Sequence, residues 1–535
     1  MSSESTTSDS PRLGRRTLLR SAGGQAFLTL ISRVLGLVRE QLRAAYLGTG
    51  AASDSFGLAL MLPNLFRRLL GEGQMMAAFL PTLVERMRHG DREEVRRFYS
   101  DFLGLFSFVS VVVVCLGYLA TPWLIETFFA SRMDEGIGQT ELTIRLTRVM
   151  FPYLAIVSVA AILQAGLHAN RLFWPSTTTP ILLNLVVILC AVFAKDFFPN
   201  PAYAFALGFV LGGLVQVLFQ VPFVLRKGLR LAPRLGWKNP NVRKVFRIFL
   251  PGVLAGGIYQ IDVFVAQMVA STLEQGRISA LQYSVRLQEL VLGVFVVSVT
   301  TVILPALSDQ VAQEGKASPE AARTLGLSTR ILALVTLPAS LGLFLIGPEI
   351  IELLFEFGEF SSESGDLVYT ALVFHSLGIF PIALSRNVVQ GFYAQKDLKT
   401  PTIVAGVVAI LHLALCFALA GPLDHGGIAL AGVVSTLLAL SLQIPILHKR
   451  GIPILTAEFF ASFWKVVLAC SCMGALVWWL KALVFVEGQG RLYLALGVVW
   501  CVCAGAAVYA LCLVLFRHPE INLLIQKLRN RRSAL

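Results

Sequence analysis

Long runs of apolar residues, separated by shorter polar stretches, follow one another along the chain from residue 25 onward. Most of these runs have about 20 residues or more, the length that a helix needs to cross the hydrocarbon core of a bilayer. We therefore predict fourteen membrane-spanning helices, one for each run. The expected spans are 25–46, 52–83, 101–123, 143–167, 176–195, 202–225, 246–271, 280–306, 329–347, 367–393, 401–420, 426–447, 460–480 and 491–516.

The composition favours an all-α polytopic membrane protein. Hydrophobic residues make up 56% of the 535 residues and charged residues only 14%, whereas about a quarter of the residues in a soluble domain are charged. A water-soluble enzyme is therefore disfavoured. The eight cysteines all lie in apolar runs, where a thiol behaves as a small hydrophobic group. We expect no disulfide framework, no metal site and no cofactor.

The distribution of basic residues predicts the orientation in the membrane. A net charge of +13 would suggest nucleic acid as the partner of a soluble chain, but in a membrane protein the cytoplasmic loops retain the lysines and arginines. The basic segments are a tail at 1–24, which we expect to be disordered, the loop 86–97, a linker at 227–245 and a tail at 517–535. The stretch 347–366 has six acidic residues and no lysine or arginine. We therefore place both termini in the cytoplasm, this acidic stretch outside, and no nucleic acid among the partners.

Short motifs recur at an offset close to 225 residues. Gln164–Asn170 resembles Val389–Gln395, and Leu80–Leu83 resembles Leu304–Leu307. The recurrence predicts two parallel six-helix repeats, as in parallel-repeat transporters; the alternative is that glycine and proline at helix ends recur by chance. The predicted domains are six-helix lobes at 25–226 and 246–449 and a C-terminal pair of helices at 450–516, whose small residues suggest a groove for a lipid tail.

Ionisable residues inside the predicted spans concentrate in spans 1, 2, 7 and 8. Such a residue is costly at the centre of a bilayer, so it usually faces a water-filled cavity or a polar partner. Arg39, Arg67 and Arg286 lie deep, and too few acids lie at similar depth to neutralise all three. Guanidinium groups hold phosphates through paired hydrogen bonds and repel cationic drugs. We therefore predict a cavity between the lobes that binds an anion such as a pyrophosphate.

Other charged residues of these spans have simpler interpretations. Asp54 lies at the outer mouth of span 2. Two pairs have the spacing of ion pairs on one helix face, and we expect them to be structural or gating pairs: Glu40 with Arg43, and Arg68 with Glu72.

Six motifs in this chain are specific enough to indicate a family. They are SRVLGLVRE at 32–40, LPNLFRRLLGEG at 62–73, AFLP at 78–81, YSVRL at 283–287, VILP at 302–305 and FYAQKDLKTP at 392–401. They closely resemble the MurJ (MviN) lipid II flippases of the multidrug/oligosaccharidyl-lipid/polysaccharide exporter superfamily, and the resemblance covers about residues 25–516. It implies fourteen helices and transport of undecaprenyl-pyrophosphate-linked peptidoglycan precursor. The family's functional residues would fall on Arg33, Arg39, Arg67 and Arg286 in the cavity, Asp54 at the outer mouth and Glu72 in span 2.

The chain departs from this family pattern next to Arg286 and at the positions where some members bind sodium. Many relatives have an acid where this chain has Val285, so Arg286 would be even less neutralised. Ala266, His412 and Cys416 occupy the positions that resemble a sodium site in some members, so the resemblance does not support sodium coupling. We expect His375 and His412 to be packing residues rather than proton carriers. The inside-negative membrane potential, worth about 2.3 kcal/mol per charge per 100 mV, is the alternative driving force.

The sequence thus predicts a flippase, not an enzyme, that carries lipid II to the outer leaflet of the cytoplasmic membrane by alternating access. The expected partners are the undecaprenyl-pyrophosphate-linked disaccharide-peptide and membrane lipid. We expect a monomer that contacts the cell-wall synthesis machinery. Two alternatives stay open: an exporter of another polyprenyl-linked oligosaccharide or a drug, and, with less support, a membrane glycosyltransferase.

Overall fold

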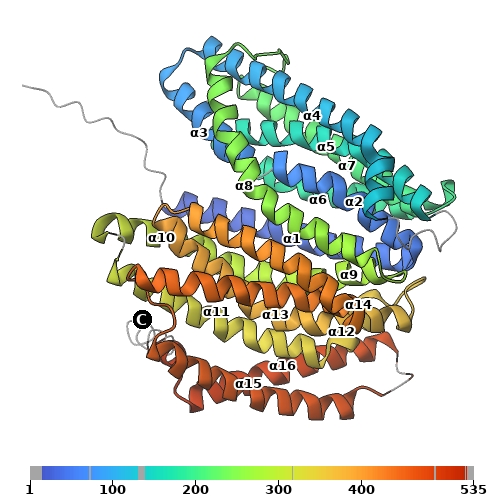
Figure 1. Cartoon of the computed structure of the whole chain (residues 1–535), viewed down its shortest axis with the longest axis vertical. Coiled ribbons are helices and arrows are strands. Elements are labelled where there is room, and N and C mark those ends of the chain that lie inside the picture. Colours follow the sequence, from blue (N-terminus) through green and yellow to red (C-terminus); the bar gives the residue numbers. More distant parts are fainter. Residues whose placement is uncertain are drawn as a thin grey trace, which may run out of the picture. The chain divides into compact units, whose positions relative to one another are not determined.

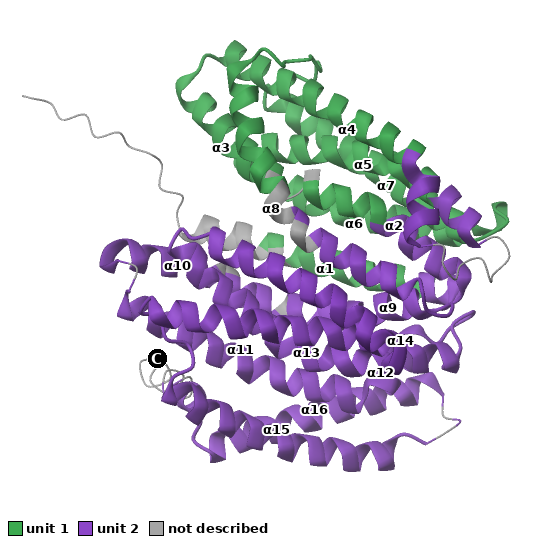
Figure 2. Cartoon of the chain, in the orientation of Figure 1, with its two compact units in different colours: residues 1–42, 62–119, 147–253 green, residues 43–61, 120–146, 254–535 purple. Residues whose placement is uncertain are grey.

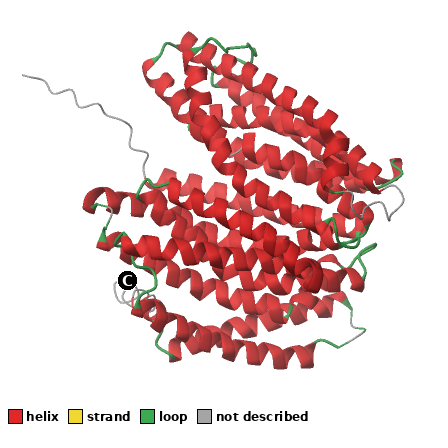
Figure 3. Ribbon diagram, viewed as in Figure 1, coloured by secondary structure: helices red, strands yellow, loops and turns green. Residues whose placement is uncertain are grey.

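The computed structural model describes residues 15–70, 74–129, 139–315, 317–486, 488, 490–523 and 526. Within these residues the chain forms helices joined by loops, without a strand (Figure 3). The expected all-α class is therefore confirmed. The tail predicted at 1–24 is shorter than expected, because helix α1 already begins at Arg15. Residues 15–24 contain no proline, so the helix of the first span continues into this polar segment. Residues 1–14 and 527–535 lie outside the described part.

The helices up to the middle of the chain are labelled in Figure 1. They are α1 (Arg15–Leu47), α2 (Ala51–Leu70), α3 (Gln74–His89), α4 (Arg92–Phe128), α5 (Gln139–Ala169), α6 (Trp174–Phe193), α7 (Ala202–Arg226) and α8 (Pro240–Ala270). The later helices are α9 (Arg277–Val291), α10 (Val297–Glu314), α11 (Pro319–Leu345), α12 (Gly347–Phe355), α13 (Ser362–Ala394), α14 (Lys399–Lys449), α15 (Ala457–Val484) and α16 (Arg491–Leu515).

Among the described residues, nine helices are long and apolar enough to cross a membrane. One of them, α14, is two helices joined at Asp424, whose backbone is non-helical with φ 52° and ψ −146°; predicted spans 11 and 12 lie on either side of this break. Predicted span 8 consists of α9 and α10 joined by a π-helical turn, Leu292–Val296. The protein is therefore a multi-pass membrane protein, and the total of fourteen spans stays a prediction.

The local sequence explains why these segments are helical. A bilayer offers the backbone no water, so each spanning segment must satisfy its own N–H and C=O groups as a helix. Side-chain caps begin several helices outside the apolar runs: Ser318 accepts a hydrogen bond from the N–H of Ala321, Ser361 from Ser364 and Thr456 from Phe459. Each such cap stabilises a helix by about 1 kcal/mol.

The chain divides into two compact units (Figure 2). Unit 1 contains residues 1–42, 62–119 and 147–253, and unit 2 contains 43–61, 120–146 and 254–535. The division falls inside helices α1, α2, α4, α5 and α8, so the ends of these helices belong to a different unit from their remainder. The boundaries of the two units therefore differ from those of the predicted lobes, 25–226 and 246–449. The two six-helix repeats stay a prediction.

Unit 1 has an aromatic core that also holds the basic linker. Phe79 and Phe102 stack with ring centroids 4.1 Å apart inside this core. The linker 227–245 is fastened to α4, because Arg96 Nε donates to the Gly228 carbonyl at 2.8 Å and the Arg234 N–H donates to the Ser100 carbonyl at 3.2 Å. The linker is therefore a packed part of unit 1 rather than a loose connection.

In unit 2, α11 packs against α13 and α15, and α15 packs against α16. The residues that face these neighbours, such as Val466 and Cys501, are buried. The opposite faces of α15 and α16 expose large apolar side chains, including Trp464, Trp478 and Trp500. Such faces are typical of helices that contact lipid tails. A groove for an isoprenoid tail at 450–516 stays a prediction.

Candidate functional site

Arg39 of α1 is held in unit 1 by three different contacts. Its Nη1 donates to Asn184 Oδ1 at 2.9 Å, and its Nη2 lies 2.6 Å from Glu40 Oε1. The guanidinium also lies over the Phe209 ring, 5.2 Å from the centroid. Asn184 is fixed in turn, because its Nδ2 donates to the Ser32 carbonyl at 3.0 Å. We expected too few acids at this depth to neutralise Arg39, Arg67 and Arg286 together; for Arg39, the neighbouring Glu40 supplies an acid.

Arg67 and Arg68 lie near the end of α2, also in unit 1. Arg67 is half-buried, and its Nε donates to Asn64 Oδ1 at 3.0 Å. An amide oxygen satisfies a donor without carrying a net charge, so this contact orients the guanidinium of Arg67. Arg68 is exposed, whereas Arg33 on α1 is half-buried. Glu72 lies outside the described residues, so its ion pair with Arg68 stays a prediction.

A second polar cluster lies in unit 2, where residues 43–61 meet the start of α9 and the loop 356–361; we call it the Asp54 junction. Arg43 is buried there, with 4% of its surface exposed. Its Nη2 donates to the Ser53 carbonyl at 3.1 Å and to Gln282 Oε1 at 3.0 Å. Its guanidinium lies over the rings of Phe56 and Tyr283, 5.2 Å and 5.1 Å from their centroids. Arg43 thus ties the α1–α2 turn to α9.

Asp54 caps α9 from a distant part of the chain. Its Oδ2 accepts the N–H of Gly276 at 2.6 Å, and its Oδ1 accepts the N–H of Ser279 at 2.8 Å. Gly276 itself has no side chain to cap the helix. The first N–H groups of a helix have no partner within the helix, and the positive end of its dipole favours a carboxylate. Asp54 therefore supplies both the acceptor and the charge that α9 needs.

Three backbone contacts close the same junction. Tyr283 Oη donates to the Gly48 carbonyl at 3.3 Å, and the N–H of Glu359 donates to the Ala45 carbonyl at 2.9 Å. Gly276 has φ +89°, and a Cβ there would lie 2.3 Å from the carbonyl oxygen of Thr49. A glycine is required at this position because both the backbone conformation and the close approach exclude a side chain.

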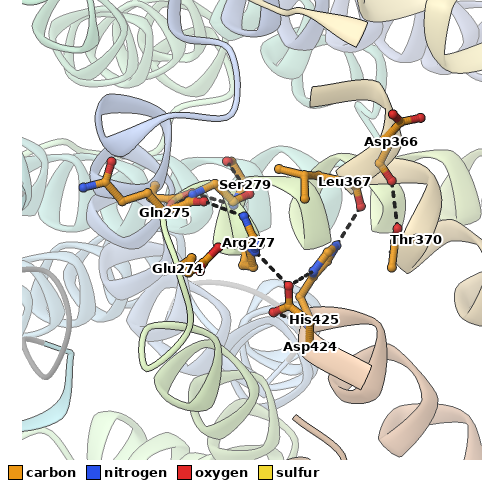
Figure 4. Close-up of polar contacts among 11 residues, drawn as sticks. Glu274, Gln275, Arg277, Ser279, Asp366, Leu367, Thr370, Asp424 and His425 are labelled. Carbon is orange, nitrogen blue, oxygen red and sulfur yellow. Dashed lines mark hydrogen bonds and ion pairs between the residues drawn. The ribbon is translucent and has the colours of Figure 1, made fainter. Parts of the chain in front are cut away.

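Next to this junction, Arg277 connects the start of α9 to the break in α14 (Figure 4). Its Nε donates to Asp424 Oδ2 at 2.9 Å and its Nη2 to Glu274 Oε2 at 2.7 Å. His425 Nε2 lies 2.7 Å from the Leu367 carbonyl on α13. The unusual backbone of Asp424 therefore places its carboxylate beside an arginine of another helix.

Arg286 lies in unit 2, on α9, six residues before the π-helical segment Leu292–Val296. Its Nη1 lies 2.8 Å from Glu289 Oε2, and both side chains are 46% exposed. The expectation that Arg286 is poorly neutralised is therefore wrong, because Glu289 follows it by one helical turn. Arg33, Arg39 and Arg67 belong to unit 1 and Arg286 to unit 2; their convergence on one cavity stays a prediction.

In the described part of the chain, no group of three or more His, Cys, Asp or Glu side chains is arranged to hold a metal ion. The polar groups of both clusters are instead guanidinium, carboxylate and amide groups. These groups are suited to holding an anion or closing a gate, and neither cluster has the paired base and nucleophile that acyl or glycosyl transfer needs.

A model of the family described as "Lipid II flippase MurJ" matches residues 43–498. The chain belongs to the MurJ family. A probable lipid II flippase MurJ of Vibrio cholerae is 32% identical over 507 residues, which are 94% of this chain and 96% of the relative. A probable lipid II flippase MurJ of Treponema pallidum is 33% identical, covering 82% of this chain and 85% of the relative.

Solved structures share the fold of this chain. A structure described as lipid II flippase MurJ in an inward closed conformation matches with a TM-score of 0.75 at 23% identity, over 92% of this chain and 98% of that one. An inward-facing transporter of the MATE family matches with a TM-score of 0.63 at 14% identity, over 80% of this chain and 98% of that one. The chain therefore has the fold that MurJ and MATE transporters share.

Sequence reasoning missed several residues of these two clusters. Asn184 is an amide inside the apolar run 176–195, and that pattern alone is a signal of a polar contact in the membrane. Gln282 and Tyr283 gave no comparable signal, because their partners lie in residues 43–61, more than 200 positions away. Asp424 also went unremarked, since the short stretch between predicted spans 11 and 12 looked unexceptional.

Proposed function

We propose that this protein moves lipid II, the undecaprenyl-pyrophosphate-linked disaccharide-peptide, from the inner to the outer leaflet of the cytoplasmic membrane. The observation that carries the proposal is the match to lipid II flippases over nearly the full length of both chains. No bond of the substrate is made or broken in this process. The protein works as a transporter, with both termini in the cytoplasm.

The pyrophosphate of the substrate binds to Arg33, Arg39, Arg67 and Arg286 in this proposal. Asn184 and Phe209 hold Arg39 in one orientation, and Asn64 orients Arg67. Guanidinium groups bind phosphate oxygens in a bidentate manner, which a fixed orientation favours.

Glu40 and Glu289 change the expected mechanism of binding. An isolated arginine inside the membrane is costly, and a carboxylate partner reduces this cost while the site is empty. A pyrophosphate carries more negative charge than one carboxylate and replaces it as the partner of Arg39 and Arg286. Binding therefore proceeds by exchange of ion pairs rather than by filling an uncompensated positive cavity. Glu40 and Glu289 therefore lower the net positive charge of the empty site, because each neutralises one of the four arginines.

The Asp54 junction serves as the gate of the transport cycle. Alternating access requires residues 43–61 to separate from α9 in one conformation. A hydrogen bond to a charged group contributes about 1.5–3 kcal/mol, and Asp54 and Arg43 form four such bonds. When the junction opens, hydrogen bonds from these groups to water offset part of the free energy that is lost. A net difference of a few kcal/mol is the range in which a ligand shifts a two-state equilibrium.

Depletion of the protein in its host tests the proposed function directly. We expect lipid II to accumulate in the inner leaflet, measured as substrate that a membrane-impermeant enzyme acting from outside does not reach. Re-expression of the wild-type chain restores access. If depleted cells turn over lipid II normally, the proposal is wrong; if they accumulate a different polyprenyl-linked oligosaccharide, the protein is another exporter of the superfamily.

A further inference from the structure

Helices α8 and α14 share a polar contact that the proposed substrate site does not use. The carboxylate of Asp262 on α8 pairs with His412 Nδ1 on α14. The other ring nitrogen of His412, Nε2, lies 3.3 Å from Cys416 Sγ, one helical turn further along α14. All three residues belong to unit 2. The histidine is thus held between a carboxylate and a thiol.

The contact lies well inside the predicted spans 7 and 11. Asp262 precedes the end of α8 at Ala270 by eight residues, and His412 precedes the break at Asp424 by twelve. With a rise of about 1.5 Å per residue, these positions are about 12 and 18 Å from the helix ends. The side chain of His412 is 6% exposed, whereas that of Asp262 is 35% exposed. Ionisable residues at such depth are costly and usually serve function.

The geometry does not suit a metal ion. Asp262 and Cys416 contact opposite nitrogens of the imidazole ring, so the three groups do not point toward a common centre. The same geometry suits a proton. In the neutral ring Nδ1–H donates to the Asp262 carboxylate and Nε2 accepts the Cys416 S–H; in the charged ring both N–H groups donate, and the sulfur becomes the acceptor. Both states keep every hydrogen bond without moving an atom heavier than hydrogen.

We propose that Asp262, His412 and Cys416 form a reversible proton-binding site in unit 2. A proton from water adds to the Nε2 lone pair of His412, the Cys416 S–H bond rotates away, and the sulfur accepts the new N–H. The charge of the Asp262–His412 pair changes from −1 to 0. In this proposal the proton reaches the pair from the side of Asp262, whose side chain is 35% exposed.

The proton affinity of His412 depends mainly on the two groups that it contacts. Asp262 and Cys416 are the ionisable groups that act on His412. Helices α9 and α13 also pack against α14. Of their ionisable groups, His375 bonds to Ser284, Arg277 pairs with Asp424 and Arg286 pairs with Glu289.

Protonation of this site shifts the conformational equilibrium of the transport cycle. This part of the proposal rests on the proposed function. Asp262 belongs to predicted span 7 and His412 to predicted span 11, so the pair is retained only in conformations that keep these helices together. A proton that binds more tightly to such a conformation shifts the equilibrium toward it. An inward proton gradient then supplies free energy to the cycle in addition to the membrane potential.

The binding itself is tested by NMR of the full-length protein in nanodiscs with ¹³C-labelled histidine. The His412 signal is assigned by its loss in His412→Gln. An opposite charge within about 4–6 Å moves a histidine titration by about 1–3 pH units, so we expect the His412 midpoint to move by at least about one unit in Asp262→Asn. It stays in place in Glu141→Gln, an exposed acid that pairs with Arg145. An unmoved midpoint in Asp262→Asn, or a His412 signal that does not titrate between pH 4 and 11, overturns the proposal.

A matched pair of substitutions tests the role of the thiol without removing a charge. Cys416→Ser keeps a group that both donates and accepts, so we expect wild-type titration to within a few tenths of a pH unit. Cys416→Val removes the group and displaces the midpoint. Equal titration of both variants would show that the sulfur takes no part.

Coupling is tested in proteoliposomes with lipid II at zero membrane potential. We expect an imposed pH gradient to change the flipping rate of the wild type several-fold and not to change that of His412→Gln. His168→Gln is the control, because His168 contacts the Ser176 hydroxyl and no acid. A wild-type rate that ignores the gradient overturns the coupling step. Absence of flipping by the wild type contradicts the proposed function instead, while the NMR experiment still decides whether the proton site exists.

Discussion

Arg39 and Arg43 lie one turn apart on α1, yet they are held in different ways. Arg39, in unit 1, has a carboxylate, an amide and one aromatic ring as partners, and its side chain is 14% exposed. Arg43, in unit 2, is 4% exposed and contacts a backbone carbonyl, a glutamine and two aromatic rings. The carboxylate partner of the partly exposed Arg39 can be exchanged for a phosphate, whereas Arg43 is buried and joins Ser53 of the α1–α2 turn to Gln282 of α9, so it is part of the packing.

This difference separates two roles that a list of intramembrane charges would merge. Arg39 has the surroundings of a residue that binds a ligand, and Arg43 has those of a residue that holds two segments together. A charged residue in a membrane helix indicates function by default, but the type of partner indicates which function.

The largest expected effect is that of Arg39→Ala. Hydrogen bonds to charged groups contribute about 1.5–3 kcal/mol, so loss of the guanidinium should lower the rate of lipid II flipping at limiting substrate by about 10- to 100-fold. We expect the same sign for Arg67→Ala and Arg286→Ala. Arg39→Lys should recover part of the activity, because lysine keeps the charge but not the paired hydrogen bonds.

Flipping is measured in proteoliposomes, with the amount of inserted protein as the control for folding. Full activity of Arg39→Ala at normal insertion would remove Arg39 from the substrate site. Arg39 would then be a packing residue like Arg43.

The next largest effect is expected for Gly276→Ala in the Asp54 junction. The alanine must adopt φ +89° and place its Cβ 2.3 Å from the Thr49 carbonyl oxygen. Such backbone strain costs about 1–3 kcal/mol. We expect a lower midpoint of thermal unfolding for the detergent-solubilised protein. Gly432→Ala on α14 is the matched control, because nothing lies within 4 Å of its added Cβ; equal midpoints for the two variants would show that the junction is not closed as described.

Much of the fold was accessible from the sequence, because it depends on local pattern. Apolar runs predicted the helices, and the motif at 392–401 contains its own turn: Lys396 has φ 60°, and Asp397 accepts the N–H of Thr400 at 3.0 Å. The family resemblance rested on the same kind of local motif. These features need no knowledge of distant partners.

The organisation of the site was less accessible, because it depends on contacts between distant segments. Arg39 and Asn184 are separated by 145 positions, and Asp54 and Gly276 by 222. His412 illustrates the limit. We expected a packing residue, and Ala266 was the aligned residue of span 7, but the acid that reaches His412 is Asp262, one turn earlier on α8. A sequence shows which residues are ionisable but not which turn of a helix faces them.

The smallest expected effect concerns Asp397. Like Arg39, this residue forms a partly exposed ion pair, here with Arg450. Burial opposes its ionisation, but the hydrogen bonds from Thr400 and the guanidinium of Arg450, 2.6 Å away, outweigh burial and hold the pKa of this carboxyl well below its ordinary value of 3.8. A lowered pKa means that the folded state favours the ionised form, so the stabilisation is complete above about pH 4 and is lost as the pH falls further.

Asp397→Asn should therefore lower the free energy of unfolding at pH 7 by about 0.5–1 kcal/mol, a small value because the Arg450 side chain is 34% exposed. The difference from the wild type should shrink as the pH falls below about 4, since the carboxyl of the unfolded wild-type chain then takes up a proton that the folded state does not bind. Thermal unfolding across this pH range measures both quantities, with Asp309→Asn on the exposed side of α10 as the control. A difference that stays constant with pH would mean that Asp397 stabilises the turn through its shape and not through its charge. Asp397 and Arg450 would then differ from Arg39 and Glu40, whose contact is an ion pair.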